Sequence, residues 1–350
     1  MVSASVILVT KGRLSYFKRA IASLLNAWNR FSHGETKIQI IVVINGVDEN
    51  AASYLEKAAD DLKNAGCILK IVQQDLTNPG QARNNGFKNV SGDWCFFIDD
   101  DAYVDKEYFV RWSQTLEKFP NVRIIGGPNL TPETSTLFQT LTGTVLSSPI
   151  SSYLSYRRYS TSGLPQPVND QSLILCNLWI KSDLLRKRDK IFNEKMECAE
   201  ENLLLQQLIK DGEVAVRDPV LYLYHERRST LNELGAQVYK YGRGRAQNII
   251  SNPASLHWAH LLPSFCMIIS GPLFVAFFLS QNALWLIPFI LYGALTIFTA
   301  GFIALKMKKN IAHSFFLATL LLVQIHVCFG AGILSGLIVR RQSTARESHG

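Results

Sequence analysis

The C-terminal third of this 350-residue chain is depleted of acidic residues over a very long stretch. Residues 234–346 contain no Asp or Glu. Three apolar runs follow one another there, at 261–279, 283–305 and 312–338. Each can cross a hydrocarbon layer of about 30 Å, which needs roughly 20 helical residues. Buried helices of a large soluble core are the alternative, but few polar residues remain to cover them. We therefore predict a membrane domain of about three helices over 258–339, with a basic polar tail over 340–350.

The positive charge of the chain is concentrated beside these runs. From residue 258 onward there are six Lys or Arg and one Glu, so +5 of the net charge of +8 lies there, where anionic lipid headgroups favour it. The remaining +3 does not form a basic nucleic-acid footprint, and we expect membrane lipids but no nucleic acid as partners. The distribution of Lys and Arg fits two crossings better than three, so one run could be re-entrant or interfacial.

Residues 1–250 alternate strand and helix patterns, which indicates an α/β domain with a mostly parallel sheet covered on both faces. The strands are predicted at 5–10, 38–45, 67–73, 94–99, 122–126, 173–180 and 214–224. The helices are predicted at 14–28, 49–64, 81–89, 105–119 and 199–210. Residues 129–170, rich in Ser, Thr and Pro, are expected to be partly irregular and to face substrate. The six scattered cysteines are predicted to be small buried residues in a reducing compartment.

Three consecutive carboxylates, Asp99, Asp100 and Asp101, come directly out of the strand WCFFID. Ligands of open α/β sheets bind at the carboxyl ends of strands. Adjacent acidic side chains repel one another unless a cation or solvent relieves them, and a hard divalent ion holding a diphosphate is the natural partner. The alternative is a solvated acidic turn that caps the next helix.

Other strand ends carry polar residues in the same order around the sheet. TKGR follows the first strand, NGVD follows the second, and QARNNG opens the helix before the acidic strand. Backbone N–H groups and an Arg at a helix start can face an anion. Each segment alone is an ordinary turn or helix cap, but together they describe a nucleotide pocket.

The series VTKGR, VINGVD, QARNNG, FFIDDD, AEENLLLQQL and YHERRS resembles the family 2 inverting glycosyltransferases of the GT-A fold, over roughly residues 3–250. The apolar runs resemble those of membrane-attached members that build exopolysaccharide or lipid-linked glycans. The resemblance implies a GT-A (nucleotide-diphospho-sugar transferase, Rossmann-like) domain followed by transmembrane helices. It also implies a nucleoside diphosphate sugar as donor, with a UDP-sugar favoured, and Mg²⁺ or Mn²⁺ as cofactor.

The same resemblance implies roles for individual residues. Nucleotide-sugar contacts are implied for Thr10, Arg13, Asn45, Asp48, Arg83, Asn84, Asp99 and, in the middle of the D-x-D arrangement, Asp100. Metal contacts are implied for Asp101 and His225. The catalytic base of such enzymes is the second acid of a Glu-Asp pair that opens a helix. Glu200 and Glu201 stand there, so Glu201 takes the base position with one extra methylene, and either Glu could abstract the proton. Alternatively, both are first-turn acids favoured by the helix dipole.

A last group of residues precedes the first apolar run. QVYKY loosely resembles the Q-x-x-R-W element of processive relatives, and GRGR follows it. The residues concerned are Gln237, Lys240, Tyr241, Arg243 and Arg245. They could hold a donor or lipid-linked diphosphate, or equally anchor the chain at lipid headgroups.

The prediction from sequence is thus a metal-dependent inverting glycosyltransferase acting on a lipid-linked saccharide or surface polysaccharide. Its place would be the inner (cytoplasmic) membrane, multi-pass, with the catalytic domain facing the cytoplasm, because the first residues read as a strand and not as a cleavable signal. Two alternatives remain. A nucleotidyltransferase would typically carry a longer Gly-rich basic loop after the first strand. A nucleotide-sugar-binding assembly or transport protein would bind without turnover.

Overall fold

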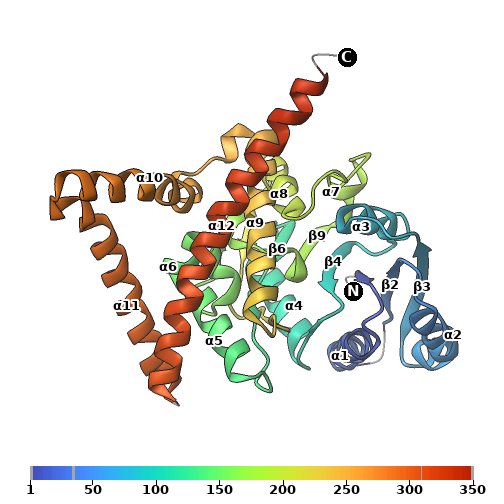
Figure 1. The fold of residues 1–350 in the computed structure, drawn as a ribbon. Helices are drawn as coiled ribbons and strands as arrows, with labels where there is room; N and C mark the ends of the chain where they lie inside the picture. The colour runs from blue at the N-terminus through green and yellow to red at the C-terminus, as the bar shows by residue number, and fades with distance from the viewer. Residues whose placement is uncertain (1–2, 34–35, 309, 348–350) are drawn as a thin grey trace. The chain divides into compact units, whose positions relative to one another are not determined.

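The computed structural model describes residues 3–33, 36–308 and 310–347, with side chains described up to residue 338 (Figure 1). It divides into two compact units, which we describe separately. The first comprises Met1–Pro132 and Arg157–Glu226, and the second comprises Glu133–Tyr156 and Arg227–Gly350. Residues 133–156 and 227–250, which lie within the predicted domain 1–250, cluster with the apolar helices.

The first unit is built on two sheets. The larger has the strand order β3 (Cys67–Gln74), β2 (Ile38–Asn45), β1 (Ala4–Thr10), β4 (Trp94–Asp99), β9 (Leu178–Lys181), β6 (Ile124–Gly126), β10 (Ala215–Arg217) and β8 (Gln166–Pro167). The smaller has the order β5 (Ala102–Tyr103), β11 (Leu223–His225) and β7 (Asn129–Leu130). The pairings β3–β2–β1–β4 are parallel, whereas β9 runs antiparallel to both β4 and β6.

Helices cover both faces of the larger sheet. They are α1 (Leu14–Ser32), α2 (Glu49–Asn64), α3 (Pro79–Phe87), α4 (Tyr108–Lys118), α7 (Ser182–Arg186) and α8 (Glu200–Lys210). The residues of β1, β2 and β4 alternate between two apolar cores. One core lies under α1, α2 and α4, and the other lies under α3 and α8 (Figure 1). The helices thereby fix the carboxyl ends of β1 and β4, where the polar residues follow.

Two predicted segments differ from the observed structure. Residues 173–180 were expected as one strand, but short 3₁₀ turns at Asp170–Ser172 and Leu175–Asn177 precede β9. Residues 214–224 form two strands in different sheets, β10 and β11, because the chain turns between them. The segment 129–170 is partly irregular, as predicted, and its regular parts include α5 (Leu137–Leu146), α6 (Pro149–Ser152) and a 3₁₀ helix over Tyr153–Tyr159.

The second unit is helical. Besides α5 and α6 it holds α9 (Leu231–Ser251), α10 (Trp258–Ser280), α11 (Ile287–Met307) and α12 (Ile311–Glu347), with 3₁₀ turns at Pro253–Ser255 and Ala283–Leu286. Residues 340–347, predicted as a polar tail, continue α12, whereas residues 348–350 of that prediction lie outside the described residues. A third apolar core joins α5, α9, α11 and α12.

Among the residues that the structure describes, three helices are long and apolar enough to cross a membrane: Trp258–Ser280, Ala283–Met307 and Ile311–Ile338. Their apolar side chains are poorly covered by protein, since Phe278, Phe298 and Phe316 are 64%, 76% and 72% exposed. Exposed apolar surface of this extent marks an interaction surface, and lipid suits helices of this length. The helices therefore indicate that the chain associates with a membrane.

Glycines allow α9 and α12 to pack closely along each other (Figure 1). A Cβ atom added at Gly332 would lie 2.1 Å from the carbonyl oxygen of Tyr239, and one at Gly242 would lie 2.3 Å from that of Phe329. Small residues at such crossings let two helix backbones approach, as is common in membrane proteins. Any larger residue must push the two helices apart.

We expect Gly332→Ala to lower the free energy of unfolding by about 1–3 kcal/mol, because the added methyl group overlaps backbone that cannot move alone. Gly301→Ala in α11 is the matched control, since a Cβ there meets nothing within 4 Å. Ala is also the better helix former, by about 1 kcal/mol. Thermal unfolding of both variants in detergent measures the difference. Equal midpoints would show that close approach of α9 and α12 does not stabilise the protein.

Candidate active site

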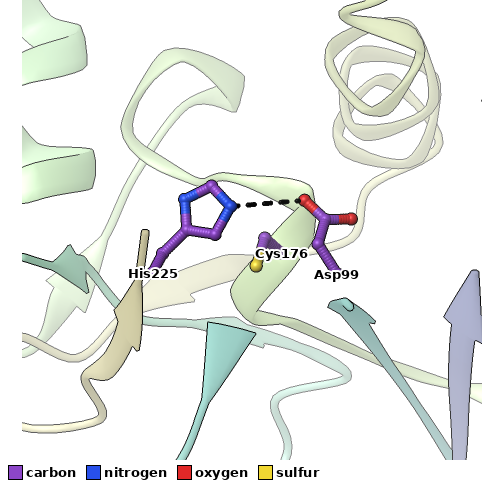
Figure 2. Close-up of side chains that lie close together, drawn as sticks. All are labelled: Asp99, Cys176 and His225. Atoms are coloured by element: carbon purple, nitrogen blue, oxygen red, sulfur yellow. Dashed lines mark ion pairs between the residues drawn. The ribbon is translucent and has the colours of Figure 1, made fainter. Parts of the chain in front are cut away.

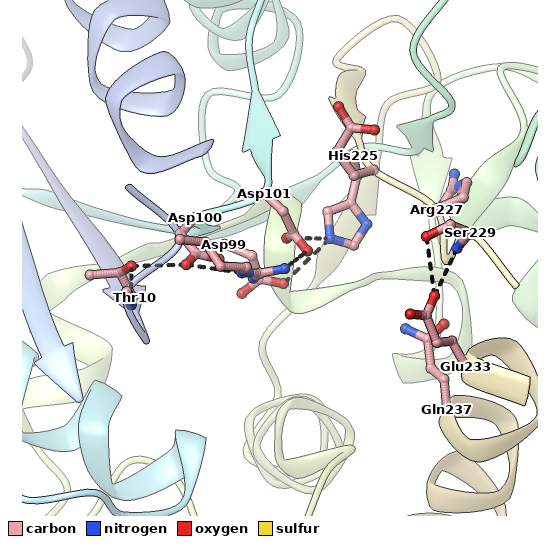
Figure 3. A network of polar contacts seen from close by, with 12 residues as sticks. Thr10, Asp99, Asp100, Asp101, His225, Arg227, Ser229, Glu233 and Gln237 are labelled. Carbon is pink, nitrogen blue, oxygen red and sulfur yellow. Dashed lines mark hydrogen bonds and ion pairs between the residues drawn. The ribbon is translucent and has the colours of Figure 1, made fainter. Parts of the chain in front are cut away.

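The three consecutive carboxylates follow β4 at the carboxyl end of the larger sheet, as predicted. Asp99 is the last residue of β4, and its side chain is 33% exposed. Asp100 and Asp101 are only 2% and 3% exposed. Figure 3 shows Thr10, at the end of the neighbouring strand β1, beside this cluster. The cluster is therefore a partly buried group of acids and not a solvated turn.

Arg13 forms ion pairs with the two buried acids, and Thr10 hydrogen-bonds one of them. The Thr10 hydroxyl donates to Asp100 at 2.9 Å, and the Arg13 guanidinium pairs with Asp100 and, at 2.6 Å, with Asp101. Burial alone would lower the pKa of Arg13, but the charges of Asp101 and Asp100 outweigh it and raise that pKa. For Asp100 burial dominates over Arg13, and its pKa is raised. Thr10 and Arg13, predicted to contact the nucleotide, thus also hold the acidic cluster together.

His225 completes the cluster from the smaller sheet. It pairs across β11 and β5 with Ala102, which brings its Nε2 atom to 2.9 Å from Asp101 Oδ1 and 3.9 Å from Asp99 Oδ2. Burial acts to raise the pKa of Asp101, but the charges of His225 and Arg13 outweigh it and hold that pKa below its ordinary value. Two carboxylates and an imidazole are a donor set that Mg²⁺ or, better, Mn²⁺ accepts. His225 is within reach of both carboxylates, and cation binding by these residues stays a prediction.

Arg83 connects this cluster to the acid pair on α8. Its guanidinium donates to Asp99 Oδ1 at 2.9 Å and to Glu200 Oε1 at 2.6 Å. Burial acts to lower the pKa of Arg83, but Glu200 and Asp99 raise it overall. Burial raises the pKa of Glu200 despite this ion pair. One buried cation thus places the first acid of the pair beside the end of β4.

Glu201 is held by a different cation, which sequence reasoning missed. Arg158 Nη1 lies 3.4 Å from Glu201 Oε1, and Arg158 Nη2 donates to Asn202 Oδ1 at 2.5 Å. The same guanidinium also donates to two backbone carbonyls, those of Asp170 and Gln171. Arg158 comes from the 3₁₀ helix in the segment predicted as irregular, and no sequence pattern connects it to α8. The two glutamates therefore lie in separate ion pairs.

The remaining predicted nucleotide contacts make bonds within the first unit. Asn45 bonds the backbone of Thr77, accepting its N–H and donating to its carbonyl at 2.9 Å each. Asp48 caps α2 by accepting from the Ala51 N–H at 3.1 Å. Asn84 donates to the Phe192 carbonyl and accepts from the Phe192 N–H, also at 2.9 Å each. These three side chains order the loops around the strand ends, and their nucleotide contacts remain a prediction.

The group predicted as diphosphate or membrane contacts belongs to α9 of the second unit. Gln237 Nε2 donates to the Tyr241 hydroxyl at 3.0 Å, one turn along the helix. Arg245 is 5% exposed, whereas Tyr241 is 38% exposed. The residues of this group therefore lie on different faces of α9, with Arg245 on a buried face and Tyr241 on an exposed face.

Comparison with known proteins assigns part of the chain to a family. Residues 5–169 match the model of glycosyl transferase family 2. The poly(ribitol-phosphate) β-N-acetylglucosaminyltransferase TarS of Staphylococcus aureus is 28% identical over 109 residues, which are 31% of this chain and 18% of that relative. The chain therefore matches less than a fifth of the curated relative.

A solved structure shares the fold. The mannosyltransferase PcManGT from Pyrobaculum calidifontis, in complex with GDP-Man and Mn²⁺, superposes with a TM-score of 0.65 at 11% identity, over 96% of this chain and 87% of that one. S. aureus TarS 1–349 in complex with UDP-GlcNAc gives a TM-score of 0.49 at 18% identity, over 71% and 66% of the two chains. The predicted α/β fold with apolar C-terminal helices is confirmed, and the chain carries a glycosyl transferase family 2 domain over residues 5–169, on a fold of the GT-A type.

Proposed function

We propose that this protein transfers a sugar from a nucleoside diphosphate sugar to an acceptor hydroxyl, with inversion at the anomeric carbon and a divalent cation as cofactor. The observation that carries the proposal is a continuous arrangement of charged side chains. An acidic cluster at the end of β4 is joined through Arg83 to the acid pair that opens α8. Transfer needs these two elements, a cationic site for the diphosphate and a carboxylate for the acceptor proton.

The chemistry assigns a separate role to each element. The bond between the anomeric carbon and the diphosphate oxygen breaks as a bond to the acceptor oxygen forms. Glu201 accepts the acceptor's proton, and the nucleoside diphosphate leaves. Asp99, Asp101 and His225 would hold Mg²⁺ or Mn²⁺, which supplies positive charge for the departing diphosphate. Glu201 suits the base better than Glu200, because Glu200 is tied to Arg83 at 2.6 Å whereas Arg158 lies 3.4 Å from Glu201.

The acceptor is proposed to be a lipid-linked saccharide or a surface polysaccharide held near the membrane. Three helices that can span a bilayer support this, because they keep the enzyme where such acceptors lie. We place the protein in the inner (cytoplasmic) membrane with the catalytic unit facing the cytoplasm, where nucleotide sugars are made. A UDP-sugar is the favoured donor, and the similarity to an N-acetylglucosaminyltransferase supports an amino sugar among the first donors to test.

The test is metal-dependent release of nucleoside diphosphate from a panel of UDP- and GDP-sugars, using membranes that contain the protein and a lipid extract as acceptor. Consumption of one donor that stops with EDTA and resumes with Mn²⁺ supports the proposal. Binding of a nucleotide sugar with no turnover across the panel would instead favour an assembly or transport role. Release of pyrophosphate from a nucleoside triphosphate would indicate a nucleotidyltransferase.

Arg158 is predicted to be a positioning residue for Glu201. Arg158→Met should lower kcat by between about 10- and 100-fold, because small displacements of a reacting group are costly, and should leave the donor KM nearly unchanged. Arg158→Lys, which keeps the charge, should recover part of the loss. The matched control is Arg188→Met, which removes a surface pair with Asp211 at the other end of α8. An equal loss in both variants would indicate that α8 is merely destabilised.

A further inference from the structure

Three possible metal ligands of different chemistry meet at the end of β4. They are a carboxylate oxygen of Asp99, the Sγ atom of Cys176 and a ring nitrogen of His225, and these atoms all lie within 4.8 Å of one another (Figure 2). They come from β4, from the 3₁₀ turn Leu175–Asn177 and from β11, which are distant in sequence. The tertiary fold alone brings them together.

The spacing of these atoms suits one small cation. Ligands at about 2.0–2.3 Å from a tetrahedral ion lie roughly 3.3–3.8 Å from one another. The His225 Nε2 atom lies 3.9 Å from Asp99 Oδ2, so little movement is needed to close the site. Arg83 occupies the other oxygen, Asp99 Oδ1, which leaves Oδ2 directed toward the imidazole.

Cys176 is held rigidly where it faces these ligands. The sulfur is buried, and the backbone of Asp99 hydrogen-bonds it. The next residue, Asn177, donates to the carbonyl oxygens of Leu221 at 2.7 Å and Pro128 at 3.2 Å, and accepts from the Tyr108 hydroxyl at 2.5 Å. Metal sites need ligands whose positions are fixed by surrounding bonds. The neighbours of Cys176 meet that requirement.

The sulfur changes which cations the site prefers. Mg²⁺ is a hard ion that takes oxygen ligands, and a set of carboxylates and an imidazole does not discriminate strongly among the other divalent ions. Thiolate ligands select softer ions, and Zn²⁺ accepts sulfur, nitrogen and carboxylate oxygen together. The burial predicted for the cysteines from sequence is observed at Cys176, but here it lies beside a carboxylate and an imidazole and not only among apolar residues.

We propose that Asp99, Cys176 and His225 form a mixed oxygen, sulfur and nitrogen site for a thiophilic divalent cation of the Zn²⁺ class. As the bond from Sγ to the metal forms, the thiol proton leaves to solvent. The inference extends the proposed function, because two of these ligands are also assigned to the cation of the donor diphosphate. A Zn²⁺-class ion therefore competes with Mg²⁺ or Mn²⁺ and inhibits transfer.

The test uses the purified full chain in detergent, with Co²⁺ alone as a spectroscopic probe and no nucleotide sugar. The parent protein is expected to show a near-ultraviolet charge-transfer band from thiolate to Co²⁺, which Zn²⁺ abolishes by displacement. Cys176→Ser should lose the band and bind Zn²⁺ at least about tenfold more weakly. Cys95→Ser is the matched control, because Cys95, in β4, is equally buried but does not belong to the group of Asp99, Cys176 and His225, and it should retain the band.

Absence of the band in the parent protein, or its full retention in Cys176→Ser, overturns the inference. If Cys176→Ser does not fold, His225→Ala is the variant to measure, because it leaves the sulfur in place. A full band in His225→Ala also overturns the inference. The readout is independent of sugar transfer. Mn²⁺-dependent turnover without a thiolate band would support the proposed function and contradict the mixed-ligand site. A thiolate band without turnover on any donor would support the mixed-ligand site and contradict the proposed function.

Discussion

Glu201→Gln is expected to lower kcat by between about 10²- and 10⁴-fold, the usual contribution of a general base, while donor binding persists. Gln keeps the size and hydrogen-bonding capacity of the side chain but cannot accept the acceptor's proton. Glu201 is 6% exposed, so water does not readily replace it as the base. Initial rates of nucleoside diphosphate release and donor affinity, measured on the same preparation, separate the two effects.

Two variants serve as controls for this prediction. Glu117→Gln changes an exposed acid on α4 and should leave the rate unchanged. Glu200→Gln removes the charge of one of the two acids that pair with Arg83. Because Arg83 also pairs with Asp99, we expect this variant mainly to weaken donor binding. If Glu200→Gln abolishes turnover at saturating donor while Glu201→Gln remains active, the base is Glu200 and the assignment is reversed.

Asp101→Asn is expected to lower kcat/KM roughly a thousandfold, which is the second large predicted effect. A cation that stabilises the departing diphosphate contributes several kcal/mol, and about 4 kcal/mol corresponds to this factor. Asn keeps the shape of the side chain but removes the charge that faces His225 at 2.9 Å and Arg13 at 2.6 Å. Activity as a function of Mn²⁺ concentration measures the loss. EDTA should lower the activity of the parent protein to a level similar to that of Asp101→Asn.

The control for this variant is Asp60→Asn, an exposed acid on α2 in the same unit. It should retain the parent's rate and Mn²⁺ dependence. Asp101→Asn could also disturb the cluster by releasing Arg13, so thermal unfolding is measured alongside. Parent-like activity in Asp101→Asn, or full activity of the parent protein in EDTA, would remove the metal from the proposed mechanism.

The sequence predicted the first half of the α/β domain closely. The strands β1, β2, β3 and β4 lie within one residue of their predicted bounds. Buried parallel strands are continuous apolar runs, and each is followed here by a short polar turn, so both ends of a strand are visible in the sequence. The acidic cluster was predicted for the same reason, since parallel strands present their carboxyl ends at one edge.

The second half of the α/β domain was predicted less well. β9 is antiparallel and only four residues long, and β10 and β11 enter different sheets. Short strands lack the periodicity that separates them from turns, and their partners are distant in sequence. Residues 137–146 form α5 with a capping box from Thr136 and Gln139, a signal that the Ser- and Thr-rich composition obscured.

The sequence by itself determined the fold class, the apolar helices and the positions of the carboxylates, because these depend on local periodicity and on charge. Only the tertiary structure decided which side chains meet those carboxylates. Arg83 joins Asp99 to Glu200, Arg158 reaches Glu201, and Cys176 and His225 converge on Asp99. Such contacts between distant segments are set by how strands pair and helices pack, which a single sequence does not encode in any local pattern.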